Sequence, residues 1–506
     1  MAYPNLPGLV VNLNDLGLQI APPPAGPKVT LLGVTSNTGI PLREPFIVSN
    51  VGQAVGALYF SGAAGSNTYP GELALAVEEV ANAGATNIEV VVIDWVTGAS
   101  VDTVMLPTGT YPATRFDKLT LAYDAIIDKP TDIVVPVNAW ADCPSVSGQF
   151  TSQLAQFCFK ASREVDNSIV GVIPTMTPLQ WALAYKSSLT GNSNVGTEVT
   201  ALTGLGHLFF NTPSQALITE WEKYLSYTGS SPVTLSPALN NHWSGFLAGA
   251  ENIDGTLMNV NSIENAATAL NTAYWTYYQG KDLTNAAVVD LRGNQADAGA
   301  RISVFAAPCI TSLVSTPKLA AKFGASLSSV VQNTDASAGY AALIASLVPH
   351  SATTNKNIPN IGPLRKLSAS QANRLAARRI VTMLDRSVGF TVSTGMTGAY
   401  NVSKYIRSDY VRLTTVRITD AVVKTVRNIG QRFIGEPNTA PSRNAMAAEI
   451  DKALRQMKAS RAITGYKFFI SATPDQQVLG EAQVDLTIVP AFELIKITVN
   501  VSLTKE

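Results

Sequence analysis

The sequence predicts a multidomain α/β protein with a mostly parallel core sheet, an inserted outer domain, an α+β C-terminal domain and extended arms at both ends. Three observations lead to this fold class. Apolar segments alternate with helical segments through the first part of the chain. Long basic helical segments take over after Pro363. The two ends carry short apolar strand patterns without a local partner.

The chain length allows several domains. Its 506 residues exceed the size of one simple core and fit roughly two to four domains. We predict an N-terminal arm at 1–27, an α/β core at 28–360 with an insertion at about 178–286, a C-terminal domain at 361–490 and a C-terminal arm at 491–506.

Continuous apolar strands and helices alternate in the core. The predicted strands lie at 28–34, 88–94, 132–137, 168–174 and 301–308, and the predicted helices at 72–84, 118–128 and 151–165. Such alternation is typical of a mostly parallel sheet covered by helices on both faces. Gly84 is expected to stop the first helix.

The insertion differs from its surroundings in composition. It is rich in Asn, Gly, Ser and Thr, and it holds Trp221, Trp243 and the aromatic cluster at 273–278. We expect these aromatic side chains to form the small core of the inserted domain, and a sugar-binding platform is the alternative.

Helices and a hairpin are predicted for the C-terminal domain. The helices lie at 368–389, 409–433 and 442–465, and the strands at 466–471 and 483–490, joined by a turn. Ser368 is the expected N-cap and Gly389 the stop of the first helix. Ser442 is the expected N-cap of the last helix, and Gly465 its terminator.

Both termini contain strands whose partners are not obvious in the chain. In the segment 495–504 the apolar residues alternate with polar ones, and in the segment 8–13 a short apolar run follows a glycine. The apolar positions are Val10, Val11 and Leu13 at one end and Ile495, Ile497, Val499, Val501 and Leu503 at the other. A strand needs a partner for its N–H and C=O groups, so we expect these strands to pair with another molecule.

Charge is divided unevenly along the chain although the total is zero. Residues 356–461 hold 19 Lys and Arg against 6 Asp and Glu, a net charge of +13, whereas residues 1–355 hold 14 against 25, a net charge of −11. On the last predicted helix Lys452, Arg455 and Lys458 lie opposite an apolar side. That apolar side consists of Met446, Ile450, Ala453, Leu454 and Met457. The basic side indicates a solvated face, a nucleic acid contact or an acidic protein partner.

Catalytic and metal-binding motifs are not found in the sequence. Its three histidines, His207, His242 and His350, follow no metal-ligand spacing, and there is no GxSxG, P-loop or GxGxxG motif. The three cysteines lack CxxC spacing and fit assembly in a cytoplasm. No signal peptide or membrane-spanning segment is expected. We therefore predict no enzymatic activity, cofactor or metal, with an unmarked hydrolase triad as the alternative.

Taken in order, several segments resemble the tail sheath proteins of contractile-tailed bacteriophages. They are "PGLVV" (7–11), "VTLLGVTSNTGIPLREPFIVSNVGQAVGAL" (29–58), "DLRGNQADAGARISVFAAP" (290–308), "SDYVRLTTVRITDAVVKTVRNIGQRFIGEPN" (408–438) and "GYKFFISA" with "VDLTIVPAFELIKITVNVSL" (465–472, 484–503). The resemblance implies a core of subtilisin-like topology. The sequence lacks the "HGTH" and "GTSM" motifs of the active proteases.

What the resemblance implies is a structural role in the virion tail. Sheath subunits stack as hexameric rings in a helix around the tail tube, with arms that add strands to neighbouring subunits. Contraction drives the tube through the host cell envelope for genome ejection. The expected partners are further copies of the chain, the tube protein, and baseplate and tail terminator proteins, without nucleic acid or membrane insertion. Lys452, Arg455 and Lys458 would face the tube, after assembly in the host bacterial cytoplasm. The alternative is the sheath of a related tailocin or secretion machine.

Overall fold

The computed structural model of the protein describes residues 26–61, 68–96, 111–143, 149–176, 233–234, 257–258, 298–306, 310–314, 330–333, 335–363, 367–387, 389–399 and 409–495. The predicted insertion and both predicted arms lie largely outside these residues.

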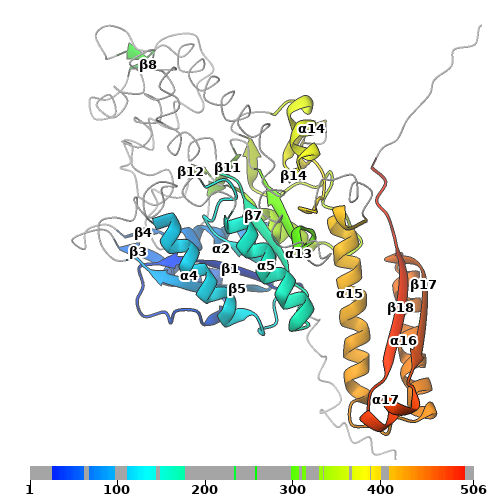
Figure 1. The fold of residues 1–506 in the computed structure, drawn as a ribbon. Helices are drawn as coiled ribbons and strands as arrows, with labels where there is room; N and C mark the ends of the chain where they lie inside the picture. Colours follow the sequence, from blue (N-terminus) through cyan, green and yellow to red (C-terminus); the bar gives the residue numbers. More distant parts are fainter. Residues whose placement is uncertain are drawn as a thin grey trace, which may run out of the picture.

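A seven-stranded sheet forms the centre of the core (Figure 1). In spatial order its strands are β14 (Ile380–Val381), β10 (Ile302–Phe305), β7 (Val170–Pro174), β6 (Ile133–Pro136), β1 (Val29–Thr35), β5 (Ile88–Trp95) and β2 (Pro45–Ile47). All neighbouring strands are parallel except β2, which pairs antiparallel with β5. All five strands predicted for the core lie in this sheet, so the prediction of a mostly parallel sheet is confirmed.

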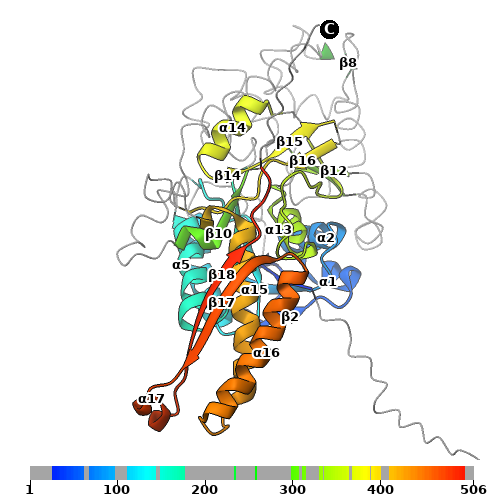
Figure 2. The same cartoon turned by 90° about the vertical axis from the view of Figure 1, so that its right-hand side faces the viewer.

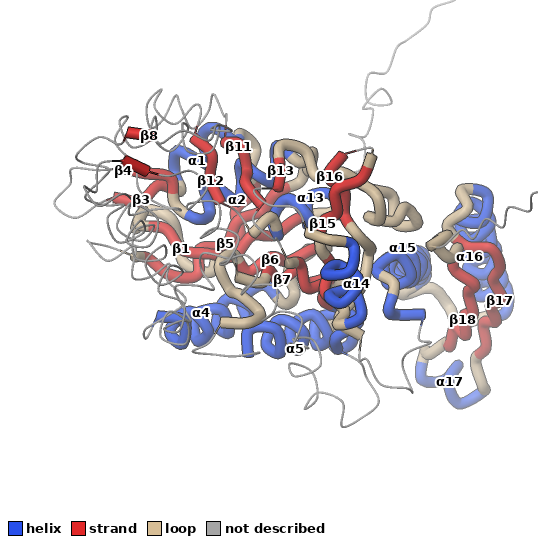
Figure 3. Tube along the Cα trace, turned by 90° about the horizontal axis from the view of Figure 1, so that it is seen from above, coloured by secondary structure: helices blue, strands red, loops and turns tan. Residues whose placement is uncertain are grey.

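Helices cover both faces of the sheet (Figure 3). One face carries α1 (Val51–Ala57), α2 (Glu72–Asn82) and α13 (Ser337–Ser346), and the other carries α4 (Tyr111–Ile126) and α5 (Gln149–Glu164). Strand β1 shows why both faces are apolar: Leu31 packs on the α2 side, and Leu32 packs on the α4 side. Successive side chains of a strand point to opposite faces, so a strand covered on both faces must be apolar throughout.

Shorter sheets surround this core. They are the sheet of β12 (Val330–Asn333), β11 (Ile310–Val314) and β13 (Ile361–Pro363), and the pairs β15 (Met383–Arg386) with β16 (Gly389–Val392), β3 (Tyr59–Ser61) with β4 (Thr68–Pro70), and β8 (Val233–Thr234) with β9 (Leu257–Met258). All of these pairings are antiparallel.

A separate C-terminal unit lies beside the core, with one long helix between the two (Figures 1 and 3). The unit contains α15 (Leu413–Gly430), α16 (Ala440–Ala459), β17 (Ile463–Ser471), α17 (Pro474–Leu479) and β18 (Gln483–Pro490). Its own small core joins α15, α16 and the β17–β18 pair, with Ile418, Ile450 and Leu454 among its buried side chains. Figure 2 shows α17 at the far end of the long hairpin.

One predicted helix of this region is too long. Ser368 caps α14 (Ala369–Ala377) through a capping box with Gln371, as expected from the sequence, but the helix stops twelve residues before Gly389. Arg379 has a left-handed φ of 63°, and the β-branched pair Ile380 and Val381 joins the core sheet as β14. Gly389 instead begins β16, in a hairpin with β15.

The boundaries predicted for the last helix are also wrong. Helix α16 begins at Ala440, because the side chain of Thr439 accepts the N–H of Ser442 and a proline occupies the first turn. It ends at Ala459, and Gly465 lies inside β17. The predicted turn between the two strands contains α17. The helix predicted at 409–433 is confirmed, with α15 continued by a 3₁₀ turn at each end.

Candidate assembly site

The β17–β18 pair, called the C-terminal ribbon below, is a two-stranded antiparallel sheet with two open edges. Its register runs from the pair Ile463 and Pro490 to the pair Ser471 and Gln483, and no other strand of the described chain pairs with it. A strand edge without a partner offers a row of free N–H and C=O groups to an incoming strand.

The two faces of the C-terminal ribbon differ. The half-buried side chains that pack on α15 and α16 are Tyr466, Phe468, Ile470, Val484, Leu486 and Ile488. Phe469 and Val489 point to the other face and are 66% and 46% exposed. The ribbon is therefore anchored on one face, while its other face and its two edges are accessible.

The basic residues predicted on α16 lie on the outside of the unit. Lys452, Arg455 and Lys458 are exposed, whereas Ile450 and Leu454 on the opposite side are fully buried. Arg455 already has a partner, because its guanidinium lies 2.7 Å from a carboxylate oxygen of Asp451. The contact of these three residues with a tail tube stays a prediction.

Helix α15 contacts two different environments along its length. Its apolar side, with Ile418, Val422 and Ile429, packs into the small core of the C-terminal unit. Its other side carries Arg417, Asp420, Lys424 and Arg427, and all four side chains bond to the core. These residues follow one another at intervals of three or four, so they lie on one face of the helix. The sequence shows this spacing, but it does not show what the charges contact.

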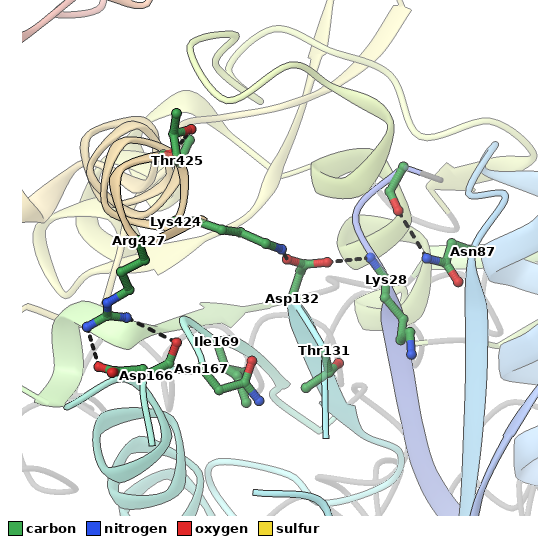
Figure 4. A network of polar contacts seen from close by, with 12 residues as sticks. Lys28, Asn87, Thr131, Asp132, Asp166, Asn167, Ile169, Lys424, Thr425 and Arg427 are labelled. Atoms are coloured by element: carbon green, nitrogen blue, oxygen red, sulfur yellow. Dashed lines mark hydrogen bonds and ion pairs between the residues drawn. The ribbon is translucent and has the colours of Figure 1, made fainter. Parts of the chain in front are cut away.

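Three ion pairs join this side of α15 to the core, and we call them the ion-pair seam. They are Arg301 with Asp420, Lys424 with Asp132, and Arg427 with Asp166. Figure 4 shows the two pairs nearer the end of α15. Lys424 Nζ lies 3.0 Å from one carboxylate oxygen of Asp132, whose other oxygen accepts the backbone N–H of Lys28 at 2.9 Å.

The pairs of the seam differ in burial. Arg301 Nη1 donates to both carboxylate oxygens of Asp420 at 2.6 Å, with side chains 19% and 14% exposed. Burial raises the pKa of Asp420, and Arg301 partly opposes this effect. Lys424 and Asp166 are 64% and 66% exposed. Salt therefore weakens the pairs Lys424–Asp132 and Arg427–Asp166 more than it weakens the pair of Arg301 and Asp420.

Arg417 fixes the upper part of α15 to the end of α13. Its guanidinium donates to the carbonyl oxygens of Ile344 at 2.8 Å and of Leu347 at 2.5 Å. These carbonyls lie at the C-terminal end of a helix, where a cation is favoured. Burial lowers the pKa of Arg417 to about 10.

A groove separates the lower part of the C-terminal unit from the core. Its volume is about 1060 Å³, and the loop at 166–168 forms the core side. The rest is lined by residues from α15, the connection between α15 and α16, α16, and the connection between β17 and β18, among them Arg427, Gln431, Asn438, Arg443, Gln476 and Glu481. Beside this groove, the C-terminal unit therefore contacts the core mainly through the Lys424 and Arg427 pairs of the ion-pair seam.

A buried charge network occupies the carboxyl edge of the parallel sheet. The connections reverse direction between β1 and β6, which is where open α/β sheets usually bind ligands. Here Glu72 accepts the N–H of Val34 at 2.7 Å and both guanidinium nitrogens of Arg115 at 2.9 and 3.0 Å. Asn138 donates to the same carboxylate at 2.8 Å. These side chains bind one another across the strand ends.

Few reactive groups lie elsewhere in the part of the chain that the structure describes. It holds no cluster of three His, Cys, Asp or Glu residues suited to a metal ion, and none of its helices is long and apolar enough to span a bilayer. Cys143 and Cys158 are buried and form no disulfide with each other, and burial raises the pKa of the Cys158 thiol far above its usual value. His207, His242 and Cys309 lie outside the described residues.

The predicted intersubunit strands also lie outside the described residues, apart from one position. Ile495 is the last described residue and is 57% exposed. Val10, Val11, Leu13, Ile497, Val499, Val501 and Leu503 are not described.

The fold is similar to that of solved structures with little sequence identity to this chain. It aligns with a chain of the anti-feeding prophage baseplate at a TM-score of 0.50 and 10% identity, covering 99% of both chains. It also aligns with a sheath tail protein from Desulfitobacterium hafniense at a TM-score of 0.42 and 7% identity, covering 96% of this chain and 100% of that one. No curated protein matches the sequence.

The sequence of the C-terminal unit matches a known family model. Residues 407–504 match the model of the phage tail sheath C-terminal domain, and this match includes α15, α16 and the C-terminal ribbon. The match covers about a fifth of the chain and supports the tail sheath family that the order of its sequence segments predicts.

Proposed function

We propose that the chain is the structural subunit of a contractile tail sheath. Copies polymerise as stacked hexameric rings in a helix around a tail tube, and contraction drives the tube through the host cell envelope. The observation that supports this most is the C-terminal ribbon: a sheet with two open edges lies at the periphery of a domain that matches the sheath family.

The open edges suit the strands predicted at the two termini. The segment 8–13 of one neighbour and the segment 495–504 of another would each add a strand, which converts two strands into four. Main-chain hydrogen bonds would supply the contact, and the alternating apolar side chains would fix its register. Two-stranded sheets are marginal alone, so added strands also stabilise the ribbon.

The remaining partners follow from the sheath role. The exposed Lys452, Arg455 and Lys458 would contact an acidic tube surface, and the ends of the polymer would contact baseplate and tail terminator proteins. Rearrangement of contacts among subunits would supply the work of contraction, so the role needs no cofactor or catalytic group. In this role the protein acts in the virion tail and assembles in the host bacterial cytoplasm.

A second candidate is the sheath of a contractile injection machine without a phage head. The likeness of the whole fold to a chain of the anti-feeding prophage baseplate favours it. Purifying the particles from producing cells separates the two candidates, because phage tails carry DNA-filled heads and injection machines do not.

Electron microscopy of the purified chain, alone and with tubes, tests the proposal. The full chain should form rods or tubes. Deletion of 494–506 or of 1–20 should leave a folded monomer that does not polymerise, because each segment serves a neighbour. Deletion of 504–506 is the matched control, since it keeps every alternating apolar position. Normal rods from the 494–506 deletion would contradict the proposed strand exchange.

A further inference from the structure

Glu493 lies where the chain leaves the C-terminal ribbon and returns to the core. The segment after β18 first bonds back to the ribbon, through the N–H of Ala491 and the carbonyl of Ala462 at 3.1 Å. Glu493 then points inward and is partly buried, whereas its neighbours Phe492 and Leu494 are 58% and 80% exposed. A carboxylate turned inward between two exposed apolar side chains indicates a specific contact.

The Glu493 carboxylate accepts hydrogen bonds from two separate parts of the protein. Thr414, in the first turn of α15 and 3% exposed, donates its hydroxyl to one oxygen. Thr354, in the loop that follows α13, donates to the other oxygen at 3.4 Å. The Thr354 contact is long, so the Thr414 contact is the stronger of the two.

Both threonines contact the joint between the core and α15, which we define as residues 393–397 packed against 409–417; Thr414 lies within it and Thr354 bonds to it. The Thr354 hydroxyl accepts the N–H of Gly395 at 3.1 Å, and the carbonyl of Gly395 accepts the N–H of Leu413 at 3.2 Å. Leu413 is buried in the apolar core under the sheet. Glu493 therefore contacts the α15 side of the joint directly and the core side through Thr354.

The charge of Glu493 suits this position. The N-cap residue of α15, Arg412, makes no capping hydrogen bond with its side chain. A carboxylate beside the first turn of a helix interacts favourably with the helix dipole. On the core side, the buried phenol of Tyr340 interacts electrostatically with both charges: Glu493 raises the pKa of Tyr340, and Arg417 lowers it.

We propose that Glu493 is a positioning residue that couples the C-terminal segment to the joint between the core and α15. A displacement of the chain that follows Leu494 would also displace the Glu493 carboxylate, which binds Thr414 and Thr354. Conversely, any change at the joint alters where the segment starts. The proposed function adds one consequence: a neighbour that holds the C-terminal strand also sets the angle of α15.

Hydrogen–deuterium exchange on the monomeric full-length protein tests the coupling without assembly. Glu493→Ala should speed amide exchange in 409–417 about tenfold, the effect of losing one charge-assisted hydrogen bond. Thr414→Val should in turn speed exchange in 491–495, because coupling between two sites is reciprocal. Exchange in β5 should stay unchanged in both variants.

Two further variants sharpen this test. Glu493→Gln keeps the size and one acceptor oxygen, so its effect should lie between those of wild type and Glu493→Ala. Glu481→Ala removes an exposed carboxylate at the far end of the ribbon and should change neither segment. Unchanged exchange at 409–417 in Glu493→Ala, or an effect of Thr414→Val confined to its own turn, would overturn the proposal.

A second measurement separates the coupling from the sheath role on which its consequence rests. In assembled rods of the wild type, exchange should slow in both 491–495 and 409–417. In rods of Glu493→Ala it should slow only in 491–495. If no rods form from any variant, the sheath role fails, and the monomer result still decides the coupling. Equal slowing of both segments in Glu493→Ala rods would contradict it.

Discussion

The guanidinium of Arg115 is enclosed by oxygen atoms at the carboxyl edge of the parallel sheet. It binds both oxygens of Glu72 and the carbonyl of Val137, and the two side chains are 3% and 1% exposed. A buried charge without its partner is costly, because neither water nor another charge compensates it. The strand ends that these side chains join would therefore separate if the pair were broken.

We predict that Arg115→Met lowers the free energy of unfolding by about 3–5 kcal/mol, because it leaves the Glu72 carboxylate buried without its cation. Lys118→Met is the matched control on the same helix. Its ion pair with Asp94, at 3.4 Å and 31% and 20% exposed, should contribute at most about 1 kcal/mol. Urea denaturation of both variants checks the contrast, and similar losses would contradict it.

The pKa of Asp420 leads to a prediction for pH. Because burial raises this pKa in the folded protein, the folded state holds the proton more tightly than the unfolded state. As pH rises from the usual carboxyl pKa through the raised one, the wild type should lose stability relative to Asp420→Asn. Above that window the difference should stay constant. Denaturation midpoints of both proteins across pH 3 to 7 measure this difference in stability. If the wild type instead gains stability relative to Asp420→Asn as pH rises, Arg301 lowers the pKa of Asp420 by more than burial raises it.

At the scale of elements, the N-terminus of α16 shows how local competition sets a boundary. Both Thr439 and Ser442 are residue types that cap helices, and they lie one turn apart. The earlier residue prevails because Pro441 has no N–H to bond and fits the first turn of a helix. The hydroxyls of the two residues also lie 3.1 Å apart, so Ser442 supports the cap that Thr439 makes.

We predict that Thr439→Ala lowers the free energy of unfolding of the C-terminal unit by about 1 kcal/mol, the usual cost of losing a cap. Ser442→Ala should change it by less than about 0.5 kcal/mol, because its backbone N–H still bonds to Thr439 and only the contact between the two hydroxyls is lost. Helicity and thermal unfolding of the two variants compare the residues directly. A larger loss from Ser442→Ala would assign the cap to Ser442 instead.

The sequence predicts elements better than their contacts. Continuous apolar runs identify the five parallel strands because both faces of each strand are covered. Helix ends are less certain, since Gly389 and Gly465 carry stop signals that the chain uses in strands instead. The ion-pair seam could not be predicted, because Lys424 and Asp132 are 292 residues apart in sequence. Glu493 gives no periodic signal, so only the structure shows its contacts.

At the scale of the whole molecule, ion pairs within the chain explain part of the uneven charge of its two regions. The basic C-terminal region and the acidic N-terminal region meet within one chain, where Lys424 and Arg427 of α15 bind Asp132 and Asp166 of the core. The bases on the outer side of α16 lie away from this contact and remain exposed. They can therefore contact a separate acidic partner, although Arg455 is also paired with Asp451.

We predict that reversing Lys452, Arg455 and Lys458 together to Glu prevents co-assembly with native tubes and leaves the helicity of the monomer unchanged. Each contact should contribute about 0.2–1 kcal/mol and weaken with salt, but many subunits repeat it. Reversing three exposed bases of the core, Lys129, Lys160 and Lys356, is the control. Sedimentation with tubes at low salt measures the difference. Equal co-assembly of both triple variants would show that another surface contacts the tube.

The length of α15 gives the joint a mechanical consequence. Its 18 residues span about 27 Å at 1.5 Å per residue, and the helix is fixed at its first turns, whereas exposed ion pairs and a groove lie along its lower part. The helix is thus a lever with its fulcrum at the joint. A rotation of about 10° there would displace the far end by roughly 5 Å, which is one strand-to-strand spacing in a sheet. A small angular change beside Glu493 would therefore move the far end of the lever by the width of a whole strand.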